Sequence, residues 1–101
     1  MNQEVLVIDD NFDIRNLISE ILKDKNYKVR VAANFDQAVF EIDKKLPDIA
    51  VVDVKLDKGD KDGIDLLKKI KSISDFVPVI MISGHANVEM AVESFGETLI
   101  R

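Results

Sequence analysis

The sequence predicts an α/β domain with a doubly wound parallel sheet, and three observations lead to this fold class. Short apolar runs alternate with segments in which apolar residues recur every three or four positions, a pattern typical of strands followed by amphipathic helices. The apolar runs are nearly continuous, as expected for strands that are buried on both faces. Four such units in succession favour parallel strands whose connecting helices cover both faces of the sheet.

The first two units lie in the N-terminal half of the chain. Residues 5–8 form the first predicted strand, and residues 29–32 form a second, weaker one. One face of the helix between them carries Ile14, Leu17, Ile18, Ile21 and Leu22. Asn34 is the expected N-cap of the second helix, which ends before Pro47. The apolar face of that helix carries Phe35, Val39 and Ile42.

The last two units repeat this plan. Residues 48–54 form the third predicted strand, and residues 79–83 form the fourth. A charged loop with the sequence KLDKGDKDG, residues 55–63, leads into a helix with an apolar face of Leu66, Leu67, Ile70 and Ile73. A fourth helix is predicted from Val88, Ala91, Val92 and Phe95. No repeat or internal linker interrupts these units, so we expect residues 1–101 to form one domain.

The composition excludes several classes of function. The formal net charge of -5 argues against direct nucleic-acid binding by this segment, because phosphate backbones need basic patches. The chain has no cysteine, which excludes disulfides and thiolate metal sites. No signal peptide is visible, and no apolar run approaches the roughly 20 residues that span a bilayer. We therefore expect a cytoplasmic domain that makes no contact with a membrane.

Polar residues stand at the ends of three predicted strands. Asp9 and Asp10 follow the first strand, Asp53 lies near the end of the third, and Ser83 ends the fourth. Parallel strands bring their carboxyl ends to one edge of the sheet, so three carboxylates and a hydroxyl are expected to converge. Adjacent carboxylates stay ionised together if water or a cation stabilises them, and carboxylate oxygens suit a magnesium-type cation. The sequence therefore predicts a Mg²⁺ site at this edge.

Asp53 is the candidate nucleophile of this site. Its carboxylate can attack a phosphoryl group to form an aspartyl phosphate, with Mg²⁺ offsetting the repulsion between the two anions. The Ser83 hydroxyl can donate to a phosphoryl oxygen. Structural explanations remain open, because Asp9 or Asp10 can cap a helix and Ser83 can open a turn. A structural role explains Asp53 less well, since an unpaired carboxylate within an apolar strand is costly.

Three stretches together resemble the receiver domain of two-component response regulators: VLVIDD, PDIAVVDV and PVIMISGH. The MISGH stretch is similar to the NtrC and NtrX group of that family. The resemblance covers nearly the whole chain and implies a flavodoxin-like (CheY-like) sheet with the strand order 2-1-3-4. The family completes this sheet with a fifth strand and helix, so residues 1–101 resemble a receiver domain that is incomplete at its C-terminus.

The resemblance also implies a role for each residue of the predicted site. Asp53 resembles the phosphoacceptor; Asp10 and Asp53 resemble direct Mg²⁺ ligands, and Asp9 would bind directly or through water. Lys55 would offer its backbone carbonyl to the metal, and Ser83 resembles the switch hydroxyl. The implied phosphoryl donor is a phosphohistidine on a sensor histidine kinase. The implied result is a switched surface that controls a transcriptional output, without enzymatic turnover.

Three features depart from the family. Asp57 stands where the family usually has a proline, and Gly63 lies ten residues after Asp53 instead of eight, so the intervening loop is longer. The chain reaches Arg101 without the strand-five lysine and switch aromatic of the family. The stretch ESFGETLIR is an unusual end to the fourth helix. We expect the apolar surface that the missing elements would cover to favour self-association.

Other functions fit the sequence less well, and one stays open. A phosphatase of the haloacid-dehalogenase type needs an acid where Lys55 stands. A calcium-binding loop needs acids where Lys58 and Lys69 stand. A pseudo-receiver, which binds partners without accepting phosphate, stays open because the acids argue against it and the missing lysine argues for it.

Overall fold

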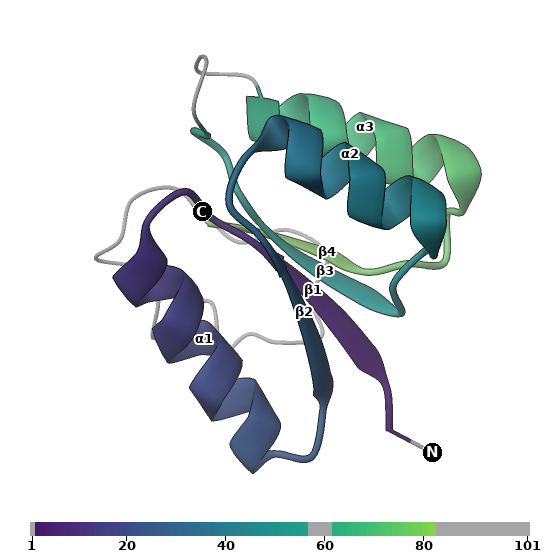
Figure 1. The fold of residues 1–101 in the computed structure, drawn as a ribbon. Coiled ribbons are helices and arrows are strands. Elements are labelled where there is room, and N and C mark those ends of the chain that lie inside the picture. Colours follow the sequence, from purple (N-terminus) through teal and green to yellow (C-terminus); the bar gives the residue numbers. More distant parts are fainter. Residues whose placement is uncertain (1, 57–61, 83–101) are drawn as a thin grey trace.

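The structure, a computed structural model, describes residues 2–56 and 62–82 and confirms the predicted fold class. Its four strands pair in parallel in the order β2-β1-β3-β4 (Figure 1). The strands are β1 (Glu4–Ile8), β2 (Lys28–Ala32), β3 (Ile49–Asp53) and β4 (Val79–Ile82). The helices in the described residues are α1 (Phe12–Asp24), α2 (Phe35–Lys44) and α3 (Asp62–Ile73). The predicted fourth helix and Ser83 lie outside these residues.

The sheet separates two apolar layers. Helix α1 covers one face, and α2 and α3 lie together on the other (Figure 1). Alternate residues of β1 enter the two layers: Val5 and Val7 pack on the α1 side, whereas Leu6 and Ile8 pack on the side of α2 and α3. Every residue of β3 and β4 is buried, which explains why their sequences are apolar throughout, with the exception of Asp53 at the end of β3. Within these ranges, no helix has the length and apolar character needed to cross a lipid bilayer.

Burial departs from the predicted apolar faces in two places. Leu17 was expected on the buried face of α1 but is 46% exposed, because it lies at the border of the stripe that contacts the sheet. Ile73, in the last turn of α3, is 52% exposed. The second strand is weaker in sequence because β2 lies at an edge of the sheet, where Val31 is 48% exposed.

Asparagines begin two of the helices. The Asn34 side chain accepts a hydrogen bond of 2.8 Å from the Gln37 amide and confirms the predicted N-cap of α2. Asn11 caps α1 in the same way, by accepting from the Ile14 amide at 3.0 Å. Asn11 directly follows Asp9 and Asp10, so the turn that carries these acids is fixed to the start of a helix.

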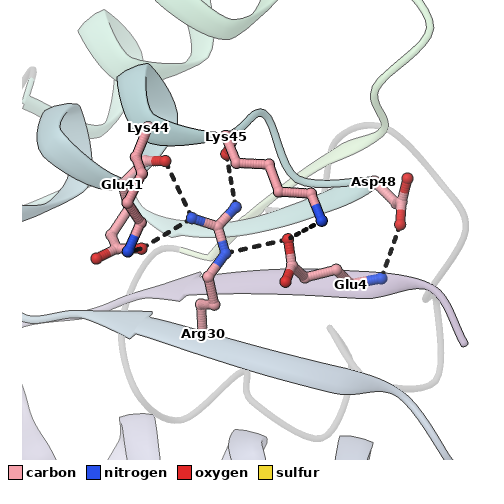
Figure 2. A network of polar contacts seen from close by, with 6 residues as sticks. All are labelled: Glu4, Arg30, Glu41, Lys44, Lys45 and Asp48. Carbon is pink, nitrogen blue, oxygen red and sulfur yellow. Dashed lines mark hydrogen bonds and ion pairs between the residues drawn. The ribbon is translucent and has the colours of Figure 1, made fainter.

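An arginine on β2 organises a polar network that includes Glu4, the first residue of β1 (Figure 2). Asp9 and Asp10 follow the other end of that strand. Arg30 Nε lies 3.1 Å from Glu4 Oε1, and its Nη1 lies 2.8 Å from Glu41 Oε1. The same guanidinium donates to the backbone carbonyls of Glu41, at 3.0 Å, and Lys45, at 2.6 Å. These carbonyls belong to the end of α2, so Arg30 ties that end to β1 and β2.

The network gives the fold a defined pH dependence through Glu41. The hydrogen bond from Arg30 lowers the pKa of the Glu41 carboxyl below its ordinary value of 4.5, with Lys44 adding to the effect. Because the pKa is lower in the folded state, Glu41 contributes stability above its ordinary pKa and loses it as the pH falls through the folded value. We therefore expect Glu41→Gln to be less stable than wild type at neutral pH, with the difference shrinking toward zero in acid.

Urea unfolding of both proteins across this pH range measures that difference. Glu20→Gln is a suitable control for the removal of a surface carboxylate, because Glu20 is exposed on α1. A constant difference between Glu41→Gln and wild type at every pH would contradict the assigned role of the carboxylate.

Candidate functional site

Three carboxylates from the ends of two strands meet at the carboxyl edge of the sheet. Asp9 and Asp10 follow β1, and Asp53 is the last residue of β3. One oxygen from each lies within 4.8 Å of the other two. Asp9 and Asp53 are buried, with exposures of 0% and 4%, whereas Asp10 is exposed. The expected convergence of the three acids is therefore present, with two of them inside the protein and one facing solvent.

The backbone holds Asp9 in place from several sides. The Asp9 amide donates to the carbonyl of Ala32 on the neighbouring strand at 3.2 Å. Its Oδ1 accepts a hydrogen bond of 2.8 Å from the Asn11 amide. The Arg15 guanidinium donates to the Asp9 carbonyl at 2.8 Å. Sequence patterns did not single out Arg15, and its only signal was a position one turn into the helix that follows the acids.

Asp53 is fixed by the turn that follows its strand. Its Oδ1 accepts a hydrogen bond of 3.1 Å from the Lys55 amide. The next residue, Val54, donates from its amide to Ile82 on β4 at 2.9 Å. The Lys55 side chain itself is exposed. The nucleophile predicted from the sequence thus lies at a strand end that hydrogen bonds hold in place, while the proposed metal contact of the Lys55 carbonyl stays a prediction.

Gly63 packs directly against the backbone of Asp53. Its amide donates to the Val54 carbonyl at 3.0 Å. A Cβ at this position would overlap the Asp53 carbonyl oxygen and would lie 2.7 Å from the Cα of Val54, so only glycine fits. The sequence showed that this glycine lies later than in the family. The structure shows that it nevertheless reaches the strand end, while Asp57 and the rest of residues 57–61 lie outside the described residues.

The donor set fits a hard divalent cation. Three carboxylates offer only oxygen ligands, which Mg²⁺ prefers and which zinc sites rarely use alone. Among residues 2–56 and 62–82, these are the residues that gather as a possible metal-binding group of three. The predicted switch residue Ser83 lies outside the described residues, as does the single histidine, His85.

Comparisons with known proteins place the chain in a family. Residues 5–99 match the family described as the response regulator receiver domain. Over 92 residues, 91% of this chain and 20% of the relative, the chain is 41% identical to the nitrogen assimilation regulatory protein NtrX of Azorhizobium caulinodans. It is 34% identical over 94 residues to sporulation initiation phosphotransferase F of Bacillus subtilis, which covers 93% of this chain and 74% of that protein.

A solved structure supports the same grouping. The crystal structure of the receiver domain of NtrX from Brucella abortus superimposes with a TM-score of 0.74 and 36% identity, covering 95% of this chain and 82% of that one. The chain spans only 20% of the length of the NtrX protein of Azorhizobium caulinodans. The match over nearly all of this chain and the shared sheet order lead to one conclusion: the chain belongs to the response regulator receiver domain family and is close in sequence to the receiver domains of NtrX proteins.

Proposed function

We propose that Asp53 accepts a phosphoryl group in a Mg²⁺-dependent transfer from a phosphohistidine of a sensor histidine kinase. Receiver domains are phosphoacceptor signalling domains rather than turnover enzymes, and this chain belongs to that family. The observation that carries the proposal is the meeting of Asp53 with two further carboxylates within 4.8 Å. Three such groups in one place favour a bound divalent cation, because their mutual repulsion is then offset.

Each residue of the cluster has a proposed task. Asp10 and Asp53 bind Mg²⁺ directly, Asp9 binds it directly or through water, and the backbone carbonyl of Lys55 adds a further ligand. When bound, the metal supplies charge that neutralises the phosphoryl oxygens during transfer. Ser83 is proposed as the switch hydroxyl on the strength of the family resemblance.

The transfer itself is a displacement at phosphorus. A carboxylate oxygen of Asp53 forms the new P–O bond while the P–N bond of the donor breaks, and its electron pair leaves with the imidazole nitrogen. The Lys55 amide, 3.1 Å from Asp53 Oδ1, holds the carboxylate in one orientation during this step. Burial of Asp53, 4% exposed, limits the access of water that would hydrolyse the acyl phosphate.

The wider setting of the domain is also part of the proposal. We place it in a longer cytoplasmic regulator with a transcriptional output, which relatives named nitrogen assimilation regulatory protein NtrX and transcriptional regulatory protein ZraR support. Its partner is then a sensor kinase, and this segment binds neither nucleic acid nor membrane. Self-association stays a prediction, supported by exposed aromatic side chains such as Phe76, which is 94% exposed.

Intact-protein mass spectrometry tests the proposed chemistry. We expect incubation with acetyl phosphate and Mg²⁺ to add the mass of one phosphoryl group, and an excess of EDTA to prevent the gain. The acyl phosphate should also be lost on treatment with hydroxylamine, unlike a phosphoserine. If neither this chain nor a version extended through a fifth strand gains mass at saturating Mg²⁺ and phosphodonor, the pseudo-receiver becomes the better explanation.

A further inference from the structure

Arg15 connects the start of α1 to the turn that carries two of the acids. Its Nη1 donates to the backbone carbonyl of Asp9 at 2.8 Å. Its guanidinium carbon lies 5.5 Å from the centroid of the Phe12 ring, in a cation–π arrangement. Arg15 is half-buried, and Phe12 is 66% exposed. One planar group is thus held between an aromatic ring and the strand end.

The position of this hydrogen bond matters for the metal site. The carbonyl of Asp9 belongs to the peptide bond that joins Asp9 to Asp10. The contact therefore fixes the orientation of the peptide plane between the two acids, and rotating that plane would move one carboxylate relative to the other. The amide of Asp9 is held separately by Ala32, and its Oδ1 by the Asn11 amide.

A second arginine provides a comparison within the same chain. Arg30 also donates to backbone carbonyls, but those belong to Glu41 and Lys45 at the end of α2. The partners drawn for it are Glu4, Glu41 and Lys45, and none of the three acids is among them (Figure 2). Loss of Arg30 should therefore weaken the fold without acting on the Asp9–Asp10 peptide.

We propose that Arg15 is a positioning residue for Mg²⁺ binding, which orients the peptide between Asp9 and Asp10 so that both carboxylates face Asp53. This role rests on the proposed function. Without Arg15 the peptide samples other orientations. Metal binding must then order the two carboxylates, which weakens the affinity for Mg²⁺. Lysine replaces the guanidinium with a point donor that lacks the planar fork, so it should restore only part of the effect.

The test compares Arg15→Met, Arg15→Lys and Arg30→Met with wild type. The Mg²⁺ dissociation constant is obtained by calorimetric titration and from the rise of Tm with Mg²⁺ concentration. We expect Arg15→Met to raise the Kd on the order of tenfold, as losses around metal ligands commonly do. Arg15→Lys should fall between Arg15→Met and wild type. Arg30→Met should lower the metal-free Tm and leave the Kd unchanged.

Phosphorylation by acetyl phosphate gives a second readout. Arg15→Met should be slow at limiting Mg²⁺ and should recover at saturating Mg²⁺, because the acceptor itself is intact. If Arg15→Met does not fold, Arg15→Lys and Phe12→Ala are measured instead. Each should raise the Kd for Mg²⁺, since lysine lacks the planar fork and Phe12 supports the guanidinium. An unchanged Kd in both would overturn the role of Arg15.

Other outcomes separate the two proposals. An equal rise in Kd for Arg15→Met and Arg30→Met would show general loosening of the fold and would overturn the positioning role. If wild type binds Mg²⁺ and Arg15→Met binds it with the same Kd, the role of Arg15 alone is overturned. Wild-type protein that binds no Mg²⁺ and gains no phosphoryl group would overturn the proposed function and this inference with it.

Discussion

Asp53→Asn is expected to abolish phosphorylation by acetyl phosphate while leaving the domain folded. The amide has the shape of the carboxylate, but its oxygen is a poor nucleophile and cannot form a stable acyl phosphate. The substitution also removes one of three carboxylates that lie within 4.8 Å of one another. Relief of this repulsion should stabilise the metal-free protein by about 1 kcal/mol, which raises Tm by about 4–8 °C in a domain of this size.

Two measurements check this expectation. Intact mass after incubation with Mg²⁺ and acetyl phosphate shows whether Asp53→Asn still gains a phosphoryl group. Thermal unfolding in EDTA gives the Tm of the metal-free protein and so measures the effect of the repulsion. Asp48→Asn is the matched control, because Asp48 is an exposed acid whose Oδ2 accepts the Glu4 amide at 2.8 Å, a contact that an amide oxygen can keep. Phosphorylation of Asp53→Asn at the wild-type rate would show that another residue is the acceptor.

Gly63→Ala is expected to destabilise the domain, although alanine normally stabilises a helix by about 1 kcal/mol relative to glycine. The new Cβ would overlap the Asp53 carbonyl oxygen, and the atoms it meets are backbone atoms of a buried strand that cannot turn aside. Overpacking of this kind costs about 1–3 kcal/mol. The cost should be near the upper end here, because backbone atoms cannot move away as a side chain can, so it exceeds the gain in helix propensity. We expect a net loss of about 2 kcal/mol.

The same substitution should also slow phosphorylation, since the strain falls on the residue that carries the proposed nucleophile. Urea unfolding measures the free energy of unfolding, and the rate of mass gain with acetyl phosphate measures the rate of phosphorylation. Lys68→Ala, at an exposed position of the same helix, should leave both nearly unchanged. If Gly63→Ala were as stable as wild type, the start of α3 would have to lie farther from the strand end than the structure places it.

Much of the fold could be predicted from the sequence because its signals are local. Continuous apolar runs identified the strands, and Asn34 identified the start of α2. The parallel arrangement followed from the alternation of strands and helices and placed the ends of β1 and β3 at one edge. Their position as neighbours followed from the family resemblance, and the pairing of β1 with β3 confirms it. The exact edge of each apolar face did not follow from the sequence, as the exposed side chains of Leu17 and Ile73 show.

The sequence by itself determined the fold class, the family and the three acids at the strand ends, because strand direction alone places those residues at one edge. Only the tertiary structure decided that Asp9 is buried while Asp10 is exposed, that Gly63 packs against the end of the strand that carries Asp53, and that Arg15 donates to the Asp9 carbonyl. These contacts depend on how a turn or helix approaches the end of a twisted sheet. Periodicity and residue type carry no information about that approach, because the packing of the two layers sets it.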